Sequence, residues 1–208
     1  SWTRGGWRMN DRRSGRRSGT RAPLRTVFAV VEGASEKIYL ERLRRLNTGI
    51  SVRIRVTNQK KAVDIVSECL RLSEREHTLP SDARVVIFDS DAVSEEDMIE
   101  AKALASKNGI IIATSNLCFE YWLLLHLEEP PMRLDRYDLY ADELTGLLGR
   151  TYVKSKGLGD AITPKSVSDA IARAKKRLPS GDPADCHRKL NSTCMHNVAG
   201  ILLSGKRD

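Results

Sequence analysis

The strongest constraint on the fold is a regular alternation of short apolar runs with amphipathic segments. The apolar runs, each typical of a strand, cover residues 26–31, 50–56, 85–88 and 110–114. The segments between them have apolar residues at helical spacing and cover residues 35–45, 62–75 and 94–109. This order predicts an α/β fold in which helices flank a mostly parallel four-stranded sheet.

Residues typical of helix ends support these boundaries. Ser35 is the expected N-cap of the first helix. Ser94, with Asp97 three residues later, has the spacing of a capping box, and Gly109 follows the end of the same segment. Two further helices are expected at residues 164–177 and about 191–203, within a helical C-terminal extension.

The positive charge of the chain is concentrated at its start. Of the net charge of +8, the first 24 residues carry +6, from seven arginines and Asp11. Composition predicts a disordered basic arm at 1–24, in which Trp2 and Trp7 lie among the cations. The arm is interpreted either as a phosphate-neutralising segment or as a solvated extension without a specific role.

Length and composition suit one domain after this arm. A 208-residue chain with 40% hydrophobic residues can bury one substantial core. We therefore expect a single domain at 25–208, with its core at about 25–130 and a helical part at about 131–208. No apolar run approaches the roughly 20 residues that span a bilayer, and no signal-peptide pattern is seen. The four cysteines lack the spacing of a disulfide framework, so we expect a cytoplasmic protein with reduced thiols and no membrane partner.

Three acidic residues follow predicted strands. Glu32 ends the first apolar run, and Asp89 and Asp91 end the third. Because the carboxyl ends of parallel strands meet at one edge of a sheet, these side chains are expected to converge. Residues two apart on an extended segment project to the same side, so both aspartates are expected to face one pocket.

Converging carboxylates repel one another unless a cation lies between them. Hard oxygen ligands suit Mg²⁺, or Mn²⁺, and such a site leaves positions for water and phosphate oxygens. This chemistry favours phosphoryl transfer or phosphodiester cleavage. The alternative for Asp89 and Asp91 is a helix cap or a solvated turn.

Three longer motifs carry a resemblance to a known family. "VVEGASE", "VIFDSD" and "SNLCFEYWLLLH" resemble the RloB family, whose domain is similar to the Toprim fold of topoisomerases, primases and OLD-type nucleases. The resemblance extends from about Arg25 to the C-terminus, and the third motif is the most specific. Leu117 stands where the family pattern has proline, and "NSTCMHNVAGILL" also lacks an expected proline. Neither departure removes a charged group, so they bear on loop geometry more than on chemistry.

The resemblance implies roles for five acids. Glu32 matches a glutamate that acts as metal ligand or as general acid and base, and Asp89 and Asp91 match metal-binding aspartates. Glu36 matches the second glutamate ligand of OLD-type nucleases, and Glu120 matches a family acid near the site. The alternative reading of Glu36 is a first-turn acid favoured by the helix dipole, and that of Glu120 is a solvated acid at a helix start.

A lysine completes the implied site. "TYVKSK" resembles the Y-x-K motif of the family, which makes Lys154 the candidate for holding a phosphate, with Lys156 as second choice. An ordinary surface lysine is the alternative.

The implied activity is a nuclease that depends on one or two Mg²⁺ or Mn²⁺ ions. The resemblance implies phosphodiester hydrolysis of DNA or RNA, including tRNA, in prokaryotic anti-phage defence or abortive infection. It also implies an ATPase partner of the AAA or ABC type. Nothing in the sequence resembles a Walker A loop. A homo-oligomer is compatible with the sequence.

Other functions stay open. "VIFDSDAV" fits the signature of haloacid-dehalogenase phosphatases, with Asp89 as nucleophile, although that family carries the motif on its first strand. A non-catalytic Toprim-like subunit that binds or senses nucleic acid is a second alternative. DNA rejoining or primase activity is less expected, because no companion domain supplies a second part of the active site.

A cluster near the C-terminus has the residue types of a zinc site. It contains Cys186, His187, Cys194 and His196, but the adjacent first pair lacks the usual spacer. Packed thiols and surface imidazoles are the expected reading. His126, at the end of an apolar turn, is expected to be structural rather than a catalytic base.

Overall fold

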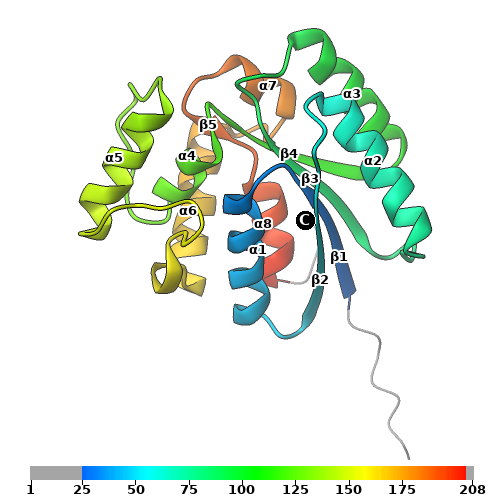
Figure 1. Cartoon of the computed structure of the whole chain (residues 1–208), viewed down its shortest axis with the longest axis horizontal. Coiled ribbons are helices and arrows are strands. Elements are labelled where there is room, and N and C mark those ends of the chain that lie inside the picture. The colour runs from blue at the N-terminus through cyan, green and yellow to red at the C-terminus, as the bar shows by residue number, and fades with distance from the viewer. Residues whose placement is uncertain (1–24, 205–208) are drawn as a thin grey trace, which may run out of the picture.

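The structure, a computed structural model, describes residues 25–204. The basic arm expected at 1–24 therefore lies outside the described residues, as do residues 205–208. Within the described part, the elements alternate as the sequence predicts, and the chain runs through a sheet covered on both faces by helices (Figure 1).

The sheet has five strands, in the order β2-β1-β3-β4-β5. They are β1 Arg25–Val31, β2 Ile50–Val56, β3 Ala83–Asp89, β4 Ile110–Asn116 and β5 Ser192–Thr193. The first four are parallel, with β1 between β2 and β3. The predicted α/β class and mostly parallel sheet are confirmed, but the prediction of four strands is wrong.

The fifth strand comes from the segment predicted to begin the last helix. Residues 192–193 pair antiparallel with the end of β4, and the helix α8, His196–Ser204, begins only afterwards. The Thr193 hydroxyl lies 2.8 Å from that of Ser115 and donates to the Thr114 carbonyl at 3.1 Å. These polar contacts with β4 explain why the helical periodicity did not extend to residue 191.

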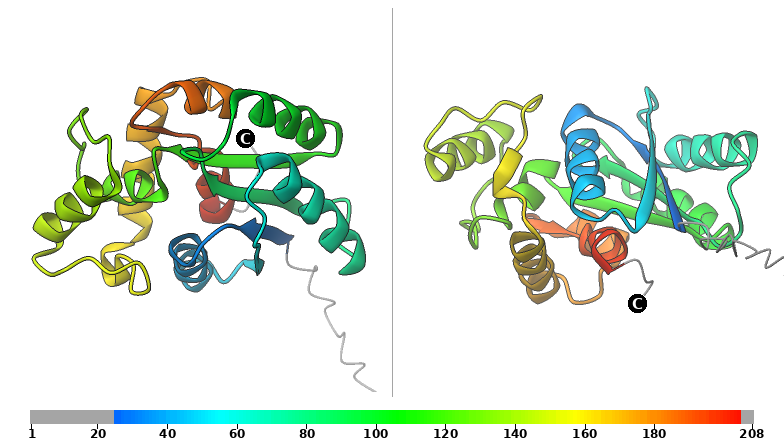
Figure 2. Two further views of the ribbon diagram at one scale, coloured as in Figure 1. Left: turned by 45° about the horizontal axis from the view of Figure 1, so that its top comes forward. Right: turned by 90° about the horizontal axis from the view of Figure 1, so that it is seen from below.

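Helices cover both faces of the sheet. The helices α2, Ala62–Arg75, and α3, Glu95–Lys107, lie on one face, whereas α1, Ala34–Leu46, and α8 lie on the other (Figures 1 and 2). Side chains of β1 alternate between the two: Val27 and Ala29 belong to the core under α1, and Phe28 and Val30 belong to the core under α2 and α3. The helices on both faces of the sheet therefore pack against the same buried strand, β1.

Most of the remaining elements lie on the α1 side of the sheet, but the last of them packs against α3 and β4. They are α4 Phe119–Leu124, α5 Tyr137–Leu148, the 3-10 turn η1 Gly159–Ala161, α6 Pro164–Arg177 and α7 Pro183–Arg188. The helix α5 packs on α4 at a distance from the sheet (Figure 1). Buried side chains of α5, α6 and α8, including Tyr140, Val167 and Val198, join the same core as β1 and α1. None of the helices described is long and apolar enough to cross a membrane.

Of the two N-caps predicted for α1 and α3, the structure has one. Gly33, not Ser35, is the N-cap of α1, which begins at Ala34, so the prediction for Ser35 is wrong. The Ser94 hydroxyl accepts the Asp97 N–H at 3.1 Å, as predicted. The Asp97 carboxylate does not complete the capping box.

Asp97 instead caps the neighbouring helix. Its carboxylate accepts the N–H groups of Ala62 at 2.6 Å and Val63 at 3.0 Å, at the start of α2. The N-cap residue of α2 is Lys61, whose side chain makes no capping hydrogen bond. A single carboxylate therefore supplies the cap that the local sequence lacks and ties α2 to α3.

We predict that Asp97→Ala lowers the free energy of unfolding by about 1–2 kcal/mol, because it removes the only side-chain cap of α2 in the described part of the chain. Asp97→Asn, which keeps one acceptor oxygen, should lose less. Urea unfolding of the two variants beside Glu100→Ala, an exposed acid on the same helix, measures the effect. A loss for Asp97→Ala no larger than that for Glu100→Ala would contradict the assignment.

Candidate active site

A pocket of about 210 Å³ lies at the carboxyl ends of β1 and β3. Its charged lining residues are Glu32, Glu36, Lys60, Asp89, Glu120 and Lys154. Four of the five acids predicted for the site, and the predicted lysine, thus reach the same pocket. The four acids follow the ends of three strands: Glu32 and Glu36 follow β1, Asp89 ends β3, and Glu120 lies in α4 directly after β4.

Glu32 links the ends of β1 and β3. Its N–H donates to the Ile87 carbonyl at 3.0 Å, and its carboxylate accepts the N–H of Asp89 at 3.3 Å. The side chain is thereby held between the two strands, beside the second predicted metal ligand. The convergence expected from parallel strand ends is seen for these two acids.

Glu36 lies in the first turn of α1 and is only 4% exposed. Gly33 makes room for it, because a Cβ at that position would lie 2.8 Å from the Glu36 carboxylate oxygen Oε2. The backbone of Gly33 has φ −139°, which any residue can adopt. Glycine therefore leaves space for the carboxylate in this position, which a larger residue would displace, and it serves no unusual backbone conformation.

The two aspartates of the third motif are placed differently. Asp89 is the last residue of β3, and its buried Oδ1 atom has no hydrogen-bond partner. Asp91 is exposed in the turn that follows and does not line the pocket. The extended backbone ends at Asp89, so the expectation that both side chains face one pocket is not met.

Glu120 is fully buried at the start of α4. Its Oε1 atom accepts hydrogen bonds from the hydroxyls of Tyr152, at 3.0 Å, and Ser35, at 3.3 Å, whereas its Oε2 atom has no partner. A carboxylate this deeply buried is not the solvated helix-start acid of the alternative reading. It is positioned by two hydroxyl groups with one oxygen left unpaired.

Two lysines pair with the acids. Lys154 is half exposed, with Nζ 3.8 Å from Glu120 Oε1 and 4.3 Å from the centre of the Tyr137 ring. Lys60, from the loop before α2, places Nζ 3.4 Å from Glu32 Oε1. Partial burial lowers the pKa of Lys154, but the surrounding negative groups, with Glu120 first, outweigh it and raise the pKa above its usual value.

The crowded acids change the titration of two carboxyl groups. Burial raises the pKa of Glu36 from its usual 4.5 to about 7, and nearby Glu120 and Glu32 contribute further. Burial also raises the pKa of Asp89 well above its usual value, and the negative charges of Glu36, Glu120 and Glu32 raise it further. The site thus holds more acidic groups than it can ionise without cost.

The donor set fits a hard divalent cation in its chemistry. Asp89 Oδ1 and Glu120 Oε2 are buried carboxylate oxygens without partners. The raised pKa of Asp89 means that this group binds such an ion as it loses its proton. Among residues 25–204, however, no three His, Cys, Asp or Glu side chains are already arranged as a metal site. Lys60 and Lys154 pair with Glu32 and Glu120 instead.

Sequence reasoning missed several residues of the pocket. Tyr152 was visible in the Y-x-K motif, but only the lysine was given a role, whereas the tyrosine hydroxyl contacts Glu120 directly. Lys60 and Ser35 carried no recognisable signal. Both come close to the acids only through the fold.

Other predicted candidates lie outside this pocket. His126 is buried and bonds the Tyr39 hydroxyl at 3.1 Å and the Trp122 carbonyl at 3.0 Å, which confirms its structural role. Cys186 and Cys194 are buried free thiols that both contact the Thr114 carbonyl. The reading of His196 as a surface imidazole is wrong, because it is buried at the start of α8.

The fold and the pocket define an α/β protein with an acidic site at the carboxyl edge of its sheet. The chain belongs to the RloB-like protein family, whose model matches residues 27–200. The resemblance seen in the sequence motifs is thereby confirmed at the level of the family. Comparisons with curated proteins and with solved structures gave no match.

The raised pKa of Glu36 predicts a pH-dependent loss of stability in protein kept free of metal by a chelator. Below about pH 4.5 the group is protonated in both states; above that, only the unfolded chain ionises until the folded pKa of about 7 is reached. The stability of the wild type relative to Glu36→Gln should therefore fall by about 3 kcal/mol between these pH values.

Urea unfolding of the wild type and Glu36→Gln at a series of pH values measures this difference. Glu100→Gln, which changes an exposed acid on α3, is the matched control and should follow the wild type throughout. A constant gap between wild type and Glu36→Gln across this pH range would show that Glu36 titrates as an ordinary surface acid.

Proposed function

We propose that this protein is a divalent-metal-dependent nuclease, which hydrolyses phosphodiester bonds of DNA or RNA. The observation that carries the proposal is the pocket in which Glu32, Glu36, Asp89 and Glu120 meet, with two buried carboxylate oxygens unpaired. Buried acids of like charge are costly unless a cation or protons compensate them. A binding site for Mg²⁺ or Mn²⁺ accounts for this cost.

Each side chain has a role in the proposed reaction. The oxygens that would hold one or two ions belong to Asp89, Glu36 and Glu120. The carboxylate of Glu32 orients Asp89 by accepting a hydrogen bond from the Asp89 backbone N–H. A divalent cation at these oxygens would polarise a phosphate group and activate water for attack on phosphorus. Asp91 would join this set only if the turn after β3 moved its side chain into the pocket.

Lys154 is proposed to offset negative charge on the phosphate. Its ammonium group lies beside Glu120 and over the Tyr137 ring, at the edge of the acid cluster. Lys60 occupies a similar position beside Glu32. Both ammonium groups now compensate carboxylates, and both become available to a phosphate once a cation takes over that role.

The family resemblance supports the wider setting of the proposal. We propose that the domain is Toprim-like, that it acts in prokaryotic anti-phage defence or abortive infection, and that an ATPase of the AAA or ABC type controls it. The substrate is proposed to be nucleic acid, including tRNA. These proposals rest on the motifs around Glu32, Asp89 and Glu120, and the site supports them only through its acids.

The placement of Asp89 favours a metal ligand over a phosphatase nucleophile. Two strand–helix units precede β3 in the chain, and the neighbouring Glu32 and Glu120 have no function in the phosphatase reading. An assay with a generic phosphate monoester separates the two, since only the phosphatase reading predicts turnover.

We predict that the purified protein, with its ATPase partner where required, cuts DNA or RNA when Mg²⁺ or Mn²⁺ is present. Asp89→Asn should reduce cutting at least about 100-fold, because it removes a charged oxygen from the centre of the acid cluster. Cleavage of labelled single- and double-stranded substrates, with and without chelator, measures the activity.

Asp142→Asn makes the same chemical change at an exposed position of α5 and should cut like the wild type. Undiminished cutting by Asp89→Asn would refute the proposed mechanism. Binding without cutting, under every pairing and metal, would favour the non-catalytic subunit instead.

A further inference from the structure

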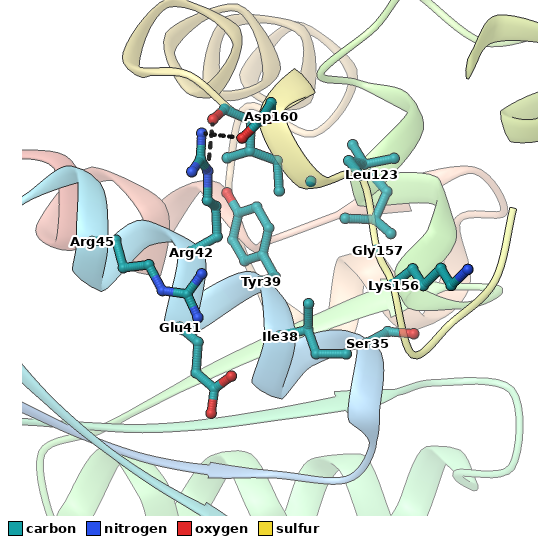
Figure 3. Close-up of a pocket in the computed structure, with 13 residues that line it drawn as sticks. Ser35, Ile38, Tyr39, Glu41, Arg42, Arg45, Leu123, Lys156, Gly157 and Asp160 are labelled. Carbon is teal, nitrogen blue, oxygen red and sulfur yellow. Dashed lines mark hydrogen bonds and ion pairs between the residues drawn. The ribbon is translucent and has the colours of Figure 1, made fainter. Parts of the chain in front are cut away.

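A second pocket, of about 150 Å³, adjoins the acidic one. It lies between α1 and the loop that leads from residue 151 to η1, and Ser35 lines both pockets (Figure 3). The Ser35 hydroxyl donates to Glu120. The two pockets therefore share Ser35 in their walls.

The second pocket has an apolar part and a charged part. The apolar part consists of Ile38 and Tyr39 of α1, Leu123 of α4, and Leu158 and Ile162 on either side of η1. Gly157 brings the loop against α1: its φ is +52°, and a Cβ there would lie 3.2 Å from the Ile38 methyl group. A cavity of roughly this size holds one benzene-sized ring in other proteins.

The rim of the pocket is charged, and part of that charge is already compensated. Arg42 pairs with Asp160 at 3.4 Å and donates to the Ile162 carbonyl at 3.2 Å (Figure 3). Glu41 pairs with Lys37 at 4.0 Å. Because these ion pairs compensate Arg42, Asp160 and Glu41, the net charge of the rim depends on its two remaining cations.

The remaining cations are Arg45 and Lys156. Neither has an ion pair or a side-chain hydrogen bond with any residue that the structure describes, and both are exposed. They stand at opposite sides of the pocket, with Lys156 on the side of Ser35 and the acidic site (Figure 3). Lys154 and Lys156, two residues apart on one loop, therefore serve two adjacent pockets.

We propose that this pocket receives the base of one unpaired nucleotide next to the phosphate at the acidic site, so that the substrate is single-stranded or locally unpaired nucleic acid. The apolar part suits a base, and the two uncompensated cations suit the phosphates on either side of it. A base within a duplex cannot enter such a pocket without leaving its stack. The inference rests on the proposed function, because it assigns the substrate of the same site.

Binding without metal tests the inference independently of cleavage. The probes are a fluorescein-labelled single strand of about 12 nucleotides, in DNA and RNA forms, and a duplex of the same length. Fluorescence anisotropy in chelator compares the full chain with the double variant Arg45→Ala, Lys156→Ala. The matched control is Arg44→Ala, Lys107→Ala, which removes two exposed cations that do not line the pocket.

We expect the pocket variant to bind the single strand about tenfold more weakly than the control, while duplex binding stays within about twofold of it. The slope of log affinity against log salt should become shallower by about 0.7 for each phosphate that the variant no longer neutralises. Ile38→Trp, which fills the pocket but keeps the cations, should remove the preference for single strands over duplex.

Pocket and control variants that bind the single strand alike would overturn the inference, as would equal losses for single strand and duplex. Cleavage assays keep the two proposals apart. If Asp89→Asn stops cutting but the pocket variant matches its control, the nuclease stands and the pocket inference falls. If the wild type never cuts but the pocket variant loses single-strand binding, the nuclease proposal falls and the pocket inference stands.

Discussion

The parallel pairing of β1 with β2 and β3 is the constraint on which the site depends. Because β1, β2, β3 and β4 are parallel, the chain must cross over a face of the sheet between one of these strands and the next. The ends of β1, β3 and β4 consequently lie at one edge and bring Glu32, Asp89 and Glu120 together from positions far apart in the sequence. Gly33 then leaves the space for Glu36. The acidic pocket is thus a consequence of topology, with a few local residues adjusting its shape.

Much of this arrangement could be predicted because its signals are local. Apolar runs and helical spacing placed four strands and the helices around them, and the strand-end positions of Glu32 and Asp89 predicted where acids would gather. Ser94 was found because a cap and its N–H partner lie within one turn. The family was found because its third motif is long and specific, although its site roles came from resemblance rather than from physical reasoning.

The features that could not be predicted depend on contacts distant in sequence. The strand β5 has two residues and exists only because β4 offers it an edge near Thr114 and Ser115. The sequence pattern gave Asp91 the same role as Asp89, but the strand ends at Asp89 and Asp91 lies exposed in the following turn. Asp97 caps a neighbouring helix rather than its own. Lys60 reaches Glu32 across 28 residues, and no pattern in either segment indicates that ion pair.

The central claim is that the acidic pocket binds a divalent cation, and crystals grown with Mn²⁺ test it most directly. The anomalous signal of manganese locates the ion without any assumption about its ligands. The account predicts a peak in the pocket, with oxygens of Asp89 and at least one of Glu36 and Glu120 as ligands, at about 2.1–2.2 Å. Saturating Mn²⁺ that leaves no peak there, with Lys60 and Lys154 still paired to Glu32 and Glu120, would contradict it.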